Sequence, residues 1–268
     1  MTLASIIVPV HNQISYTQQC LRAIKNNTLH PFELVIVDNG SSLDALLSVV
    51  YILSWFPQTM LLRNSANKGF TIAANQGIIL ARGEYIVLLN NDVLPHLQWL
   101  SKLAECAESD PLIGVVGPKV LVPGTDTIHA MGGMLFTREG TYLPLGRGAG
   151  LNDPRFQDVL DCQYVEGSCM LVKRQVLDRV GLFDEVFSPG YFEDADFCFR
   201  VREAGFRCVC CPDAVVSHYS TVTASLPELS ESLGAASKRN EQVFRQRWAH
   251  MLPENPPALA AEAAGGQP

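Results

Sequence analysis

The chain has 268 residues, 47% of them apolar, and a formal net charge of −7. This apolar content supplies a sizeable core, and the acidic balance excludes a general nucleic-acid binder, which would present a basic face. Eight cysteines scattered through apolar stretches indicate buried thiols in a reducing compartment. The N-terminal residues do not resemble a signal peptide and no apolar run approaches ~20 residues, so we expect a cytoplasmic protein.

Short apolar runs alternate with helical patterns over the first 90 residues. Strands are expected at 5–10, 33–37, 60–63 and 85–89, and helices at 15–27, 43–56 and 71–80. This alternation predicts an α/β fold with a mostly parallel, Rossmann-like central sheet and helices on both faces. Right-handed crossovers put the ends of the first, second and fourth strands at one edge, so we expect Val10, Asp38 and Asp92 to come together.

The pattern changes after residue 95. We expect a helix at 95–108, a strand at 115–122, an irregular segment with short strands at 123–160, a strand at 164–173, a helix at 174–180, a helix ending near 204, a strand at 206–216 and a helix at 229–250. The predicted organisation is a single domain, 1–252, with a nucleotide-binding half (1–122) and an acceptor-side half (123–252). The Pro/Ala/Gly-rich tail, 253–268, is predicted to be disordered.

The fourth strand runs directly into Asn90, Asn91 and Asp92. Ligands of open α/β sheets bind outside the carboxyl ends of the strands, so Asp92 is the first candidate for a functional residue. The alternative is a polar turn that caps the next helix.

Other polar clusters also stand at element ends: Asp38, residues 193–196 (EDAD) and His218. Each has a structural alternative in turn formation, helix capping or an Asp196–Arg200 pair. Together they predict more, because carboxylate and imidazole ligands with open positions for phosphates suit Mg²⁺ or Mn²⁺. A further carboxylate could deprotonate an attacking hydroxyl, so the set predicts transfer of a group from a phosphorylated donor.

Seven motifs occur in order: 5–12 (SIIVPVHN), 35–42 (VIVDNGSS), 67–70 (NKGF) with 74–77 (ANQG), 89–92 (LNND), 167–171 (GSCML), 192–196 (FEDAD) and His218. Over residues 3 to about 250 the chain resembles family 2 glycosyltransferases, most closely the branch that includes bacterial rhamnosyltransferases. The resemblance implies a GT-A fold and an inverting transfer of a sugar from a nucleoside diphosphate.

The resemblance also implies roles for single residues. Asp194, or its neighbour Glu193, would be the catalytic base, and Asp92 and His218 would bind the metal. The donor-binding positions would be Pro9, Val10, His11, Asn12, Asp38, Asn67, Gly69, Asn75, Asn90 and Asn91. Asn90 departs from the family's Asp-x-Asp motif by replacing its first acid with an amide, which leaves one charge fewer on the metal.

The implied partners are a UDP- or dTDP-sugar, with dTDP-rhamnose as one candidate, and a glycan or lipid-linked acceptor. The nearly all-apolar helix at 43–56 predicts either a core helix or a contact with a second copy or with the inner face of the cytoplasmic membrane.

The alternative functions are a binding module and two other classes of enzyme. A non-catalytic nucleotide-sugar-binding module would share the donor site. A sugar nucleotidyltransferase is disfavoured because residues 11–13 (HNQ) carry no basic side chain. A dinucleotide oxidoreductase is disfavoured because no Gly-x-Gly-x-x-Gly follows the first strand.

Overall fold

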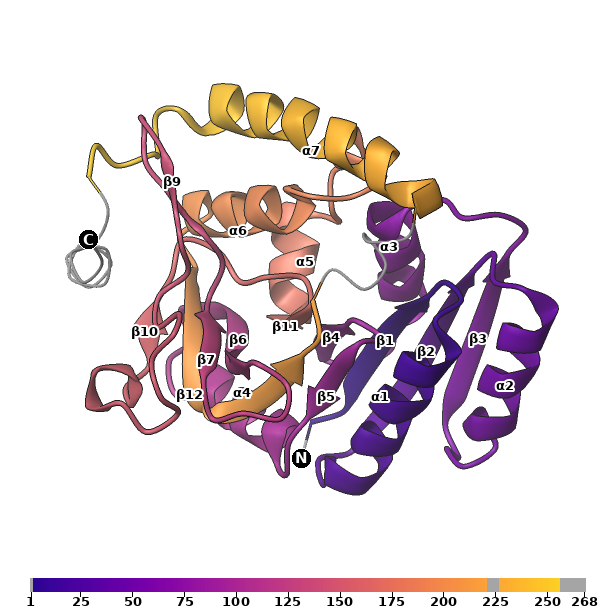
Figure 1. Cartoon of the computed structure of the whole chain (residues 1–268). Helices are drawn as coiled ribbons and strands as arrows, with labels where there is room; N and C mark the ends of the chain where they lie inside the picture. The colour runs from indigo at the N-terminus through magenta and orange to yellow at the C-terminus, as the bar shows by residue number, and fades with distance from the viewer. Residues whose placement is uncertain (1, 221–226, 256–268) are drawn as a thin grey trace.

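A computed structural model describes residues 2–220 and 227–255 (Figure 1). The strands are β1 (Ala4–Val10), β2 (Phe32–Asn39), β3 (Thr59–Asn64), β4 (Tyr85–Leu89), β5 (Val93–Pro95), β6 (Ile113–Leu121), β7 (Ile128–Met131), β8 (Leu135–Phe136), β9 (Thr141–Tyr142), β10 (Leu160–Asp161), β11 (Cys169–Lys173) and β12 (Arg207–His218). The helices are α1 (Ile14–Asn27), α2 (Leu43–Leu53), α3 (Phe70–Leu80), α4 (Trp99–Glu108), α5 (Arg174–Val180), α6 (Glu193–Glu203) and α7 (Pro227–Trp248). Single 3₁₀ turns occupy Pro154–Phe156 and Glu185–Phe187.

The main sheet runs in the order β10-β12-β6-β11-β4-β1-β2-β3. Strands β3, β2, β1 and β4 are parallel, and β11 enters antiparallel between β4 and β6. Strands β6 and β12 are again parallel to each other. The predicted mostly parallel α/β sheet is therefore confirmed.

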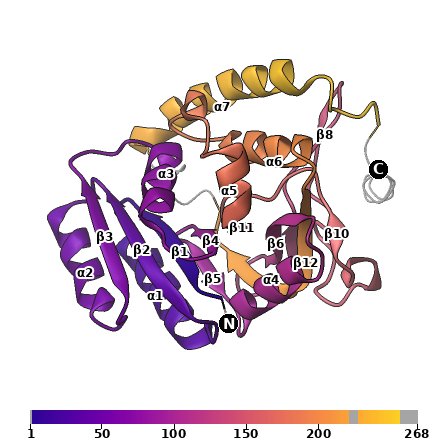
Figure 2. The ribbon, with the colours of Figure 1, turned by 180° about the vertical axis from the view of Figure 1, so that it is seen from behind.

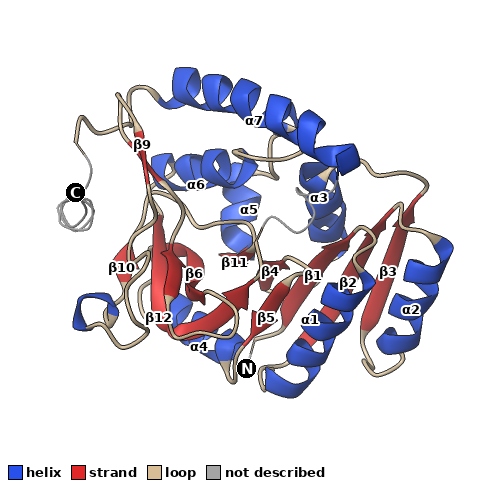
Figure 3. Ribbon diagram, in the orientation of Figure 1, coloured by secondary structure: helices blue, strands red, loops and turns tan. Residues whose placement is uncertain are grey.

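Both faces of the sheet are covered, as Figure 3 shows with helices in blue and strands in red. Successive residues of a strand point to opposite faces, so Ile6 and Val8 belong to the core under α1, α2 and α4, whereas Ile7 belongs to the core under α3, α5 and α6. Burial on both faces explains why β1 reads as a continuous apolar run.

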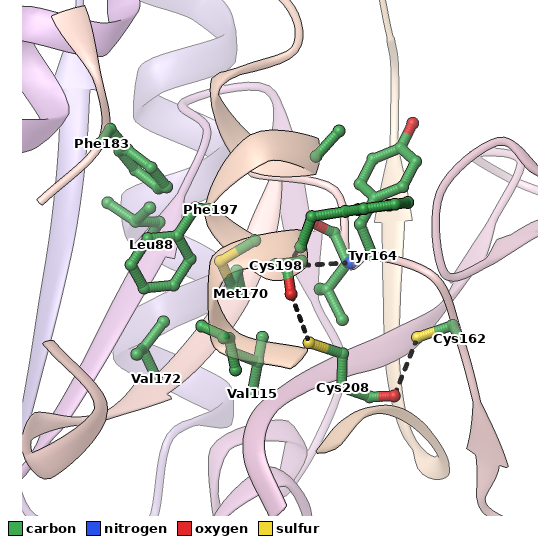
Figure 4. Close-up of a cluster of buried hydrophobic side chains, with 14 of the residues drawn as sticks. Leu88, Val115, Cys162, Tyr164, Met170, Val172, Phe183, Phe197, Cys198 and Cys208 are labelled. Atoms are coloured by element: carbon green, nitrogen blue, oxygen red, sulfur yellow. Dashed lines mark hydrogen bonds between the residues drawn. The ribbon is translucent and has the colours of Figure 1, made fainter. Parts of the chain in front are cut away.

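Helix α6 packs on β11 and β12 through a cluster of buried side chains (Figure 4). Phe197 and Cys198 of α6 pack with Met170 of β11, and the thiol of Cys208 donates to the carbonyl of Cys198 at 3.7 Å. All eight cysteines are free and buried, in keeping with their apolar surroundings. The same packing fixes the N-terminus of α6, which carries Glu193.

Helix α7 lies across the outside of α6 and is seen along the same end of the molecule from both sides (Figures 1 and 2). Its Phe244 is fully buried against Phe136, Phe192 and Phe199, whose ring centroids lie 5.0–5.5 Å away. Helix α7 therefore forms a further layer outside α6.

Two predicted elements are wrong at their starts. The helix expected from Pro95 begins at Trp99, because Val93–Pro95 form the short strand β5, which pairs antiparallel with the end of β12. The strand expected at 164–173 begins at Cys169, because a turn occupies the residues around Gly167. Both errors fall next to the functional site, where backbone leaves regular structure.

The irregular segment at 123–160 contains the short strands β7 to β10, of which β7 and β10 join the main sheet. Helix α2 ends at Leu53 instead of residue 56, and Leu47 and Tyr51 on it are 57% and 70% exposed. Within the described residues, no helix is long and apolar enough to cross a membrane. Most of the predicted disordered tail, 256–268, lies outside the described residues.

Candidate active site

The carboxyl ends of β1, β2 and β4 form one edge of the sheet, as the crossovers predicted. Val10 is the register partner of Asp38, and β4 lies on the other side of β1. Asn90 directly follows β4, and its N–H donates to the carbonyl of Ser168 at 2.8 Å. Asp92 lies two residues further along the chain. The predicted cluster of strand ends is therefore present.

Asp38 is 2% exposed and has one satisfied oxygen and one open oxygen. Its Oδ1 accepts the N–H of Ser41 at 3.2 Å. Its Oδ2 makes only a 3.5 Å ion-pair contact with Arg63 and lacks a hydrogen-bond partner in the described part of the chain. A buried carboxylate oxygen without a donor suits the N–H or O–H of a ligand.

The loop from β1 to α1 is tied to the loop after β2. His11 Nδ1 lies 3.0 Å from the carbonyl of Asn39, and the N–H of Asn12 donates to Ser41 Oγ at 2.8 Å. The side chain of Asn12 in turn accepts the N–H of Ser42 at 2.9 Å. These contacts shape one wall of the predicted nucleoside pocket.

Asn39 organises the neighbouring loop; it belongs to the motif at 35–42 but was not among the predicted site residues. Its Nδ2 donates to Asn67 Oδ1 at 2.8 Å, and its Oδ1 accepts from the N–H of Lys68 at 3.0 Å and from Asn64 Nδ2 at 3.0 Å. Asn67 also accepts the N–H of Gly69. The side-chain amide of Asn67 is thus engaged in the loop itself.

Gly69 has a positive φ of 86°, and a Cβ there would lie 2.6 Å from Pro189. Glycine is needed because the loop backbone touches the segment that leads into α6. The N–H of Phe70, at the start of α3, donates to the carbonyl of Pro189 at 2.6 Å. The loop before α3 and the segment before Glu193 are therefore joined directly.

Three of the predicted donor-binding residues are held away from the strand edge or are covered. Asn75 is buried and exchanges two hydrogen bonds with the backbone of Phe183, at 2.9 and 3.0 Å. Asn91 donates to Thr17 Oγ1 of α1 at 2.9 Å. Val10 is 1% exposed. Their contacts are those of structural residues, whereas Pro9, His11, Asn12 and Asn90 are partly exposed at the edge.

Asp92 and His218, 126 residues apart in the chain, lie side by side. His218 Nε2 is 3.1 Å from Asp92 Oδ1. The contact arises because Val93 of β5 pairs with His218 of β12, and the N–H of Tyr219 donates to the carbonyl of Asp92. Ser220 Oγ lies 3.3 Å from His218 Nδ1 and orients the ring.

This pair fits a divalent cation. Mg²⁺ in octahedral coordination has ligands at ~2.0–2.1 Å, which puts two adjacent ligand atoms about 3 Å apart, the separation found here. No group of three or more His, Cys, Asp or Glu side chains arranged to hold a metal occurs in residues 2–220 and 227–255. The protein thus offers two ligands, and the remaining positions suit phosphate oxygens and water.

Glu193 and Asp194 begin α6, and their environments differ. Asp194 is partly exposed, and its oxygens accept the N–H groups of Gly167 at 2.9 Å and of Ala195 at 2.7 Å. Glu193 is 4% exposed, and its Oε2 has no hydrogen-bond partner in the part of the chain that the structure describes. Burial, followed by the charge of Asp194, raises the pKa of Glu193 well above its usual range.

Burial also raises the pKa of Asp194, but its two backbone donors act in the opposite direction. Hydrogen bonds to the ionised form stabilise a carboxylate, and an unpartnered buried oxygen favours the protonated form. The pair therefore carries one negative charge most readily on Asp194, with the proton on Glu193.

Glu166 lies near the candidate site but was not among the residues predicted from the sequence. Burial raises the pKa of Glu166 to about 7, and the charge of Asp194 adds to this rise, while His218 and Arg147 oppose it. Burial, and after it the charges of Asp194 and Glu166, raises the pKa of Tyr164, whose hydroxyl accepts the N–H of Met134. Glu166 thus lies within electrostatic range of both Asp194 and His218.

Arg147, in the segment 123–160, lies within electrostatic range of Glu166. Arg147 sits between Gly146 and Gly148, which both have positive φ, on a turn whose Gly148 N–H donates to the carbonyl of Ile128. Its charge lowers the pKa of His129, after the larger effect of burial, and His129 Nε2 lies 3.5 Å from Ser220 Oγ. Residues 2–220 and 227–255 supply no hydrogen bond or ion pair to the Arg147 side chain.

The model of the family described as "Glycosyl transferase family 2" matches residues 5–181, more than half of the chain. The chain belongs to glycosyl transferase family 2. The match ends before α6, so Glu193, Asp194 and His218 lie outside it and their roles stay predictions.

Two relatives are similar to this chain over most of its length. An uncharacterized protein, y4gI, of Sinorhizobium fredii is 29% identical over 92% of this chain and 27% of its own length. The N-acetylglucosaminyl-diphospho-decaprenol L-rhamnosyltransferase of Mycobacterium tuberculosis is 26% identical over 80% of this chain and 75% of its own length. The chain thus spans only about a quarter of the first relative.

Among solved structures, the mannosyltransferase PcManGT of Pyrobaculum calidifontis, in complex with GDP-Man and Mn²⁺, superposes with a TM-score of 0.60. The alignment has 19% identity and covers 81% of this chain and 56% of that one. The likeness confirms the predicted GT-A fold, and that neighbour was solved with a nucleotide sugar and a divalent cation.

Proposed function

We propose that the protein is an inverting glycosyltransferase that moves a sugar from a nucleoside-diphosphate donor to a hydroxyl group of a glycan or lipid-linked acceptor. The observation that carries the proposal is that one carboxyl group, Glu166, lies within electrostatic range both of the carboxylate Asp194 and of His218, which is paired with Asp92 in a contact of metal-ligand type. Family membership and the GT-A fold support the same reaction class.

On the donor side, the open Oδ2 of Asp38 would accept a hydrogen bond from the base or ribose of the nucleotide. His11 and Asn12 would form the adjoining wall. A divalent cation, Mg²⁺ or Mn²⁺, held by Asp92 and His218 would offset the charge that grows on the leaving diphosphate. Only two protein ligands are needed because the diphosphate supplies others.

The reaction is a single displacement. The acceptor oxygen forms a bond to the anomeric carbon while the bond from that carbon to the phosphate oxygen breaks, and the diphosphate departs with the electron pair. The acceptor proton passes to Asp194, whose ionised form is stabilised, against the effect of burial, by hydrogen bonds from the N–H groups of Gly167 and Ala195. Attack opposite to the leaving group inverts the configuration.

Glu193 has a supporting role in this scheme. Its buried, protonated carboxyl group places no second charge beside Asp194, so one base is available at neutral pH. Glu166 is the second candidate for the base, because its pKa of about 7 suits proton transfer near neutrality. Variants of the three carboxylates distinguish these roles.

Arg147 supplies the positive charge on the acceptor side. Its electrostatic effect on both Glu166 and His129 puts it near the acidic group, and it has no competing partner of its own in the described chain. A phosphate of the donor or of a lipid-linked acceptor would occupy it. The mycobacterial relative is named for a diphospho-lipid-linked acceptor, which supports the same acceptor class here.

The exposed side of α2 is proposed to meet the membrane that carries such an acceptor. Leu43, Leu47 and Tyr51 form an apolar stripe, each more than half exposed. Trp55 follows it, with the charges of Arg22 and Lys25 over its ring at 6.0 and 5.1 Å. Apolar, aromatic and basic side chains on one surface suit an anionic bilayer interface.

The test is release of nucleoside diphosphate from a panel of UDP-, dTDP- and GDP-sugars, with and without a lipid diphosphate-linked acceptor, at saturating Mn²⁺ and with chelator. Acceptor-dependent release that needs the cation, together with an inverted anomeric product by NMR, supports the proposal. Tight donor binding with no turnover on any acceptor would instead identify a nucleotide-sugar-binding module.

A further inference from the structure

The turn that leads into the carboxylate pair is built from unusual backbone. Tyr191 and Phe192, directly before Glu193, have positive φ angles of 71° and 73°. Non-glycine residues keep this conformation only where the surroundings fix it. The segment 186–191 also has no strand partner, so its carbonyl groups must be satisfied from elsewhere.

Helix α7 supplies those partners. The side-chain amide of Asn240, which is fully buried, donates to the carbonyls of Phe187, Gly190 and Tyr191 at 2.7, 3.0 and 2.9 Å. Arg239 donates to the carbonyl of Ser188 at 2.5 Å. One buried side chain therefore holds both sides of the turn.

The orientation of the amide is itself determined. Arg239 donates to Asn240 Oδ1 at 2.8 Å, and a guanidinium group cannot accept a hydrogen bond. The oxygen of Asn240 must therefore face Arg239, and its NH₂ must face the three carbonyls. Asp in place of Asn240 would lack these donors.

A second attachment lies on the far side of the pair. Asp196, fully buried, accepts from Arg247 at 2.8 Å and from Trp248 Nε1 at 2.9 Å, both of α7. In the sequence, Glu193 and Asp194 thus lie between two segments that α7 holds by hydrogen bonds, 187–191 and Asp196.

We propose that Asn240 is a positioning residue for sugar transfer, and that α7 acts through it as a brace that sets the position of Asp194. The family model ends at residue 181 and so does not cover α7. The inference rests on the proposed transferase function, because it names the residue that keeps the base of that reaction in place.

The experiment uses the full chain with Asn240→Leu and Asn240→Asp, and with Arg245→Met as the matched control. Arg245 also lies on α7 and makes three hydrogen bonds, but to Glu241, Thr137 and Thr141, away from the turn. Three quantities are measured for each folded variant: hydrogen exchange of the peptide 187–196, kcat and KM for transfer, and the Kd for nucleoside diphosphate with Mn²⁺.

Asn240→Leu is expected to speed exchange at 187–196 and to lower kcat by ~100-fold, the loss that a displacement of about 1 Å at a reacting group can cause. The Kd for nucleoside diphosphate should change little, because Asp38, Asp92 and His218 lie on other elements. Arg245→Met should speed exchange near 137–142 and leave kcat within about threefold, since none of the Arg245 hydrogen bonds reaches the turn and Met can keep the contact with the Phe136 ring.

A kcat within about threefold of wild type in both Asn240 variants, or an equal fall of kcat in Arg245→Met, would overturn the proposal. If Asn240→Leu does not fold, Asn240→Asp, which keeps the volume, decides. Absence of transfer by the wild-type protein counts against the proposed function alone. In that case unchanged exchange at 187–196 in the Asn240 variants refutes the brace, and faster exchange supports it.

Discussion

Replacing Asp194 by Asn tests which carboxyl group accepts the proton of the acceptor. The wild-type carboxylate accepts two backbone N–H groups, from Gly167 at 2.9 Å and from Ala195 at 2.7 Å. Asn has nearly the same shape but cannot take a proton, and its NH₂ group must face one of those donors. A positioned general base contributes ~10²–10⁴-fold, so the barrier to transfer should rise by about 3–5 kcal/mol.

The matched variant is Glu193→Gln. Glu193 is buried with an unpartnered oxygen, and burial holds its pKa well above the usual range. Gln resembles the protonated form, so kcat should fall by less than about tenfold, well short of the loss expected for a base. The two adjacent residues are therefore predicted to respond very differently to the same loss of charge.

The assay is single-turnover sugar transfer with Mn²⁺ and acceptor at saturation, which separates chemistry from product release. Calorimetry with nucleoside diphosphate checks that donor binding is retained. Burial raises the pKa of Asp194, so wild-type kcat should rise with pH through that pKa, and Asp194→Asn should abolish the rise. A larger loss in Glu193→Gln than in Asp194→Asn would refute the reasoning and make Glu193 the base.

Further outcomes follow from the same site. Asp92→Ala should weaken binding of nucleoside diphosphate in the presence of Mn²⁺ by at least ~10-fold, and equal affinities by calorimetry would contradict the ligand role. Glu166 has a pKa of about 7 in the fold against an ordinary 4.5, so its contribution to stability is complete below pH 4.5 and is lost as pH rises to 7. Urea unfolding should therefore show the wild type losing at most about 3 kcal/mol over that range relative to Glu166→Gln, and parallel curves would show that Glu166 ionises normally. Leu47→Glu and Tyr51→Glu alter exposed side chains of α2 and should change the free energy of unfolding by only ~0.5 kcal/mol while they reduce sedimentation with anionic liposomes. Unchanged sedimentation would remove α2 as a membrane contact.

The arrangement of β1 to β4 could be predicted from the sequence because its signals are local. Each strand of β1 to β4 is an apolar run ended by a polar turn, and crossover handedness then fixes which ends meet. The pairing of Val10 with Asp38 is the direct result. Helix α2 was also visible, but its exposed side was not, because a helix that is apolar all round does not indicate which side is covered.

Glu166 was missed because the apolar residues around it read as part of a strand. In the structure the strand starts at Cys169, and residues 166–168 turn so that the N–H of Gly167 reaches Asp194, 27 residues away. A Glu next to a Gly in an otherwise apolar run was the available signal. Its meaning depended on contacts between distant parts of the chain.

The brace on α7 shows the same limit. Asn240 lies in a helix of mixed charge, and a lone amide there resembles a surface residue. Its burial follows from the segment 187–191, whose carbonyl groups require donors once the chain leaves regular structure. These carbonyl groups lie 49 to 53 residues away in the chain from the side chain that donates to them.

The metal-type pair depends on a strand of only three residues, β5. In the sheet order, β11 and β6 separate β4 from β12, so Asp92 after β4 would not reach His218 at the end of β12 by strand order alone. The three residues of β5 carry the chain across, and the pairing of Val93 with His218 brings the two side chains to 3.1 Å. A three-residue strand that ends in Pro95 has no detectable period, so it was read as the start of a helix. The meeting of the strand ends thus follows from the strand pattern, whereas the contact between Asp92 and His218 is set by a short pairing that tertiary structure alone reveals.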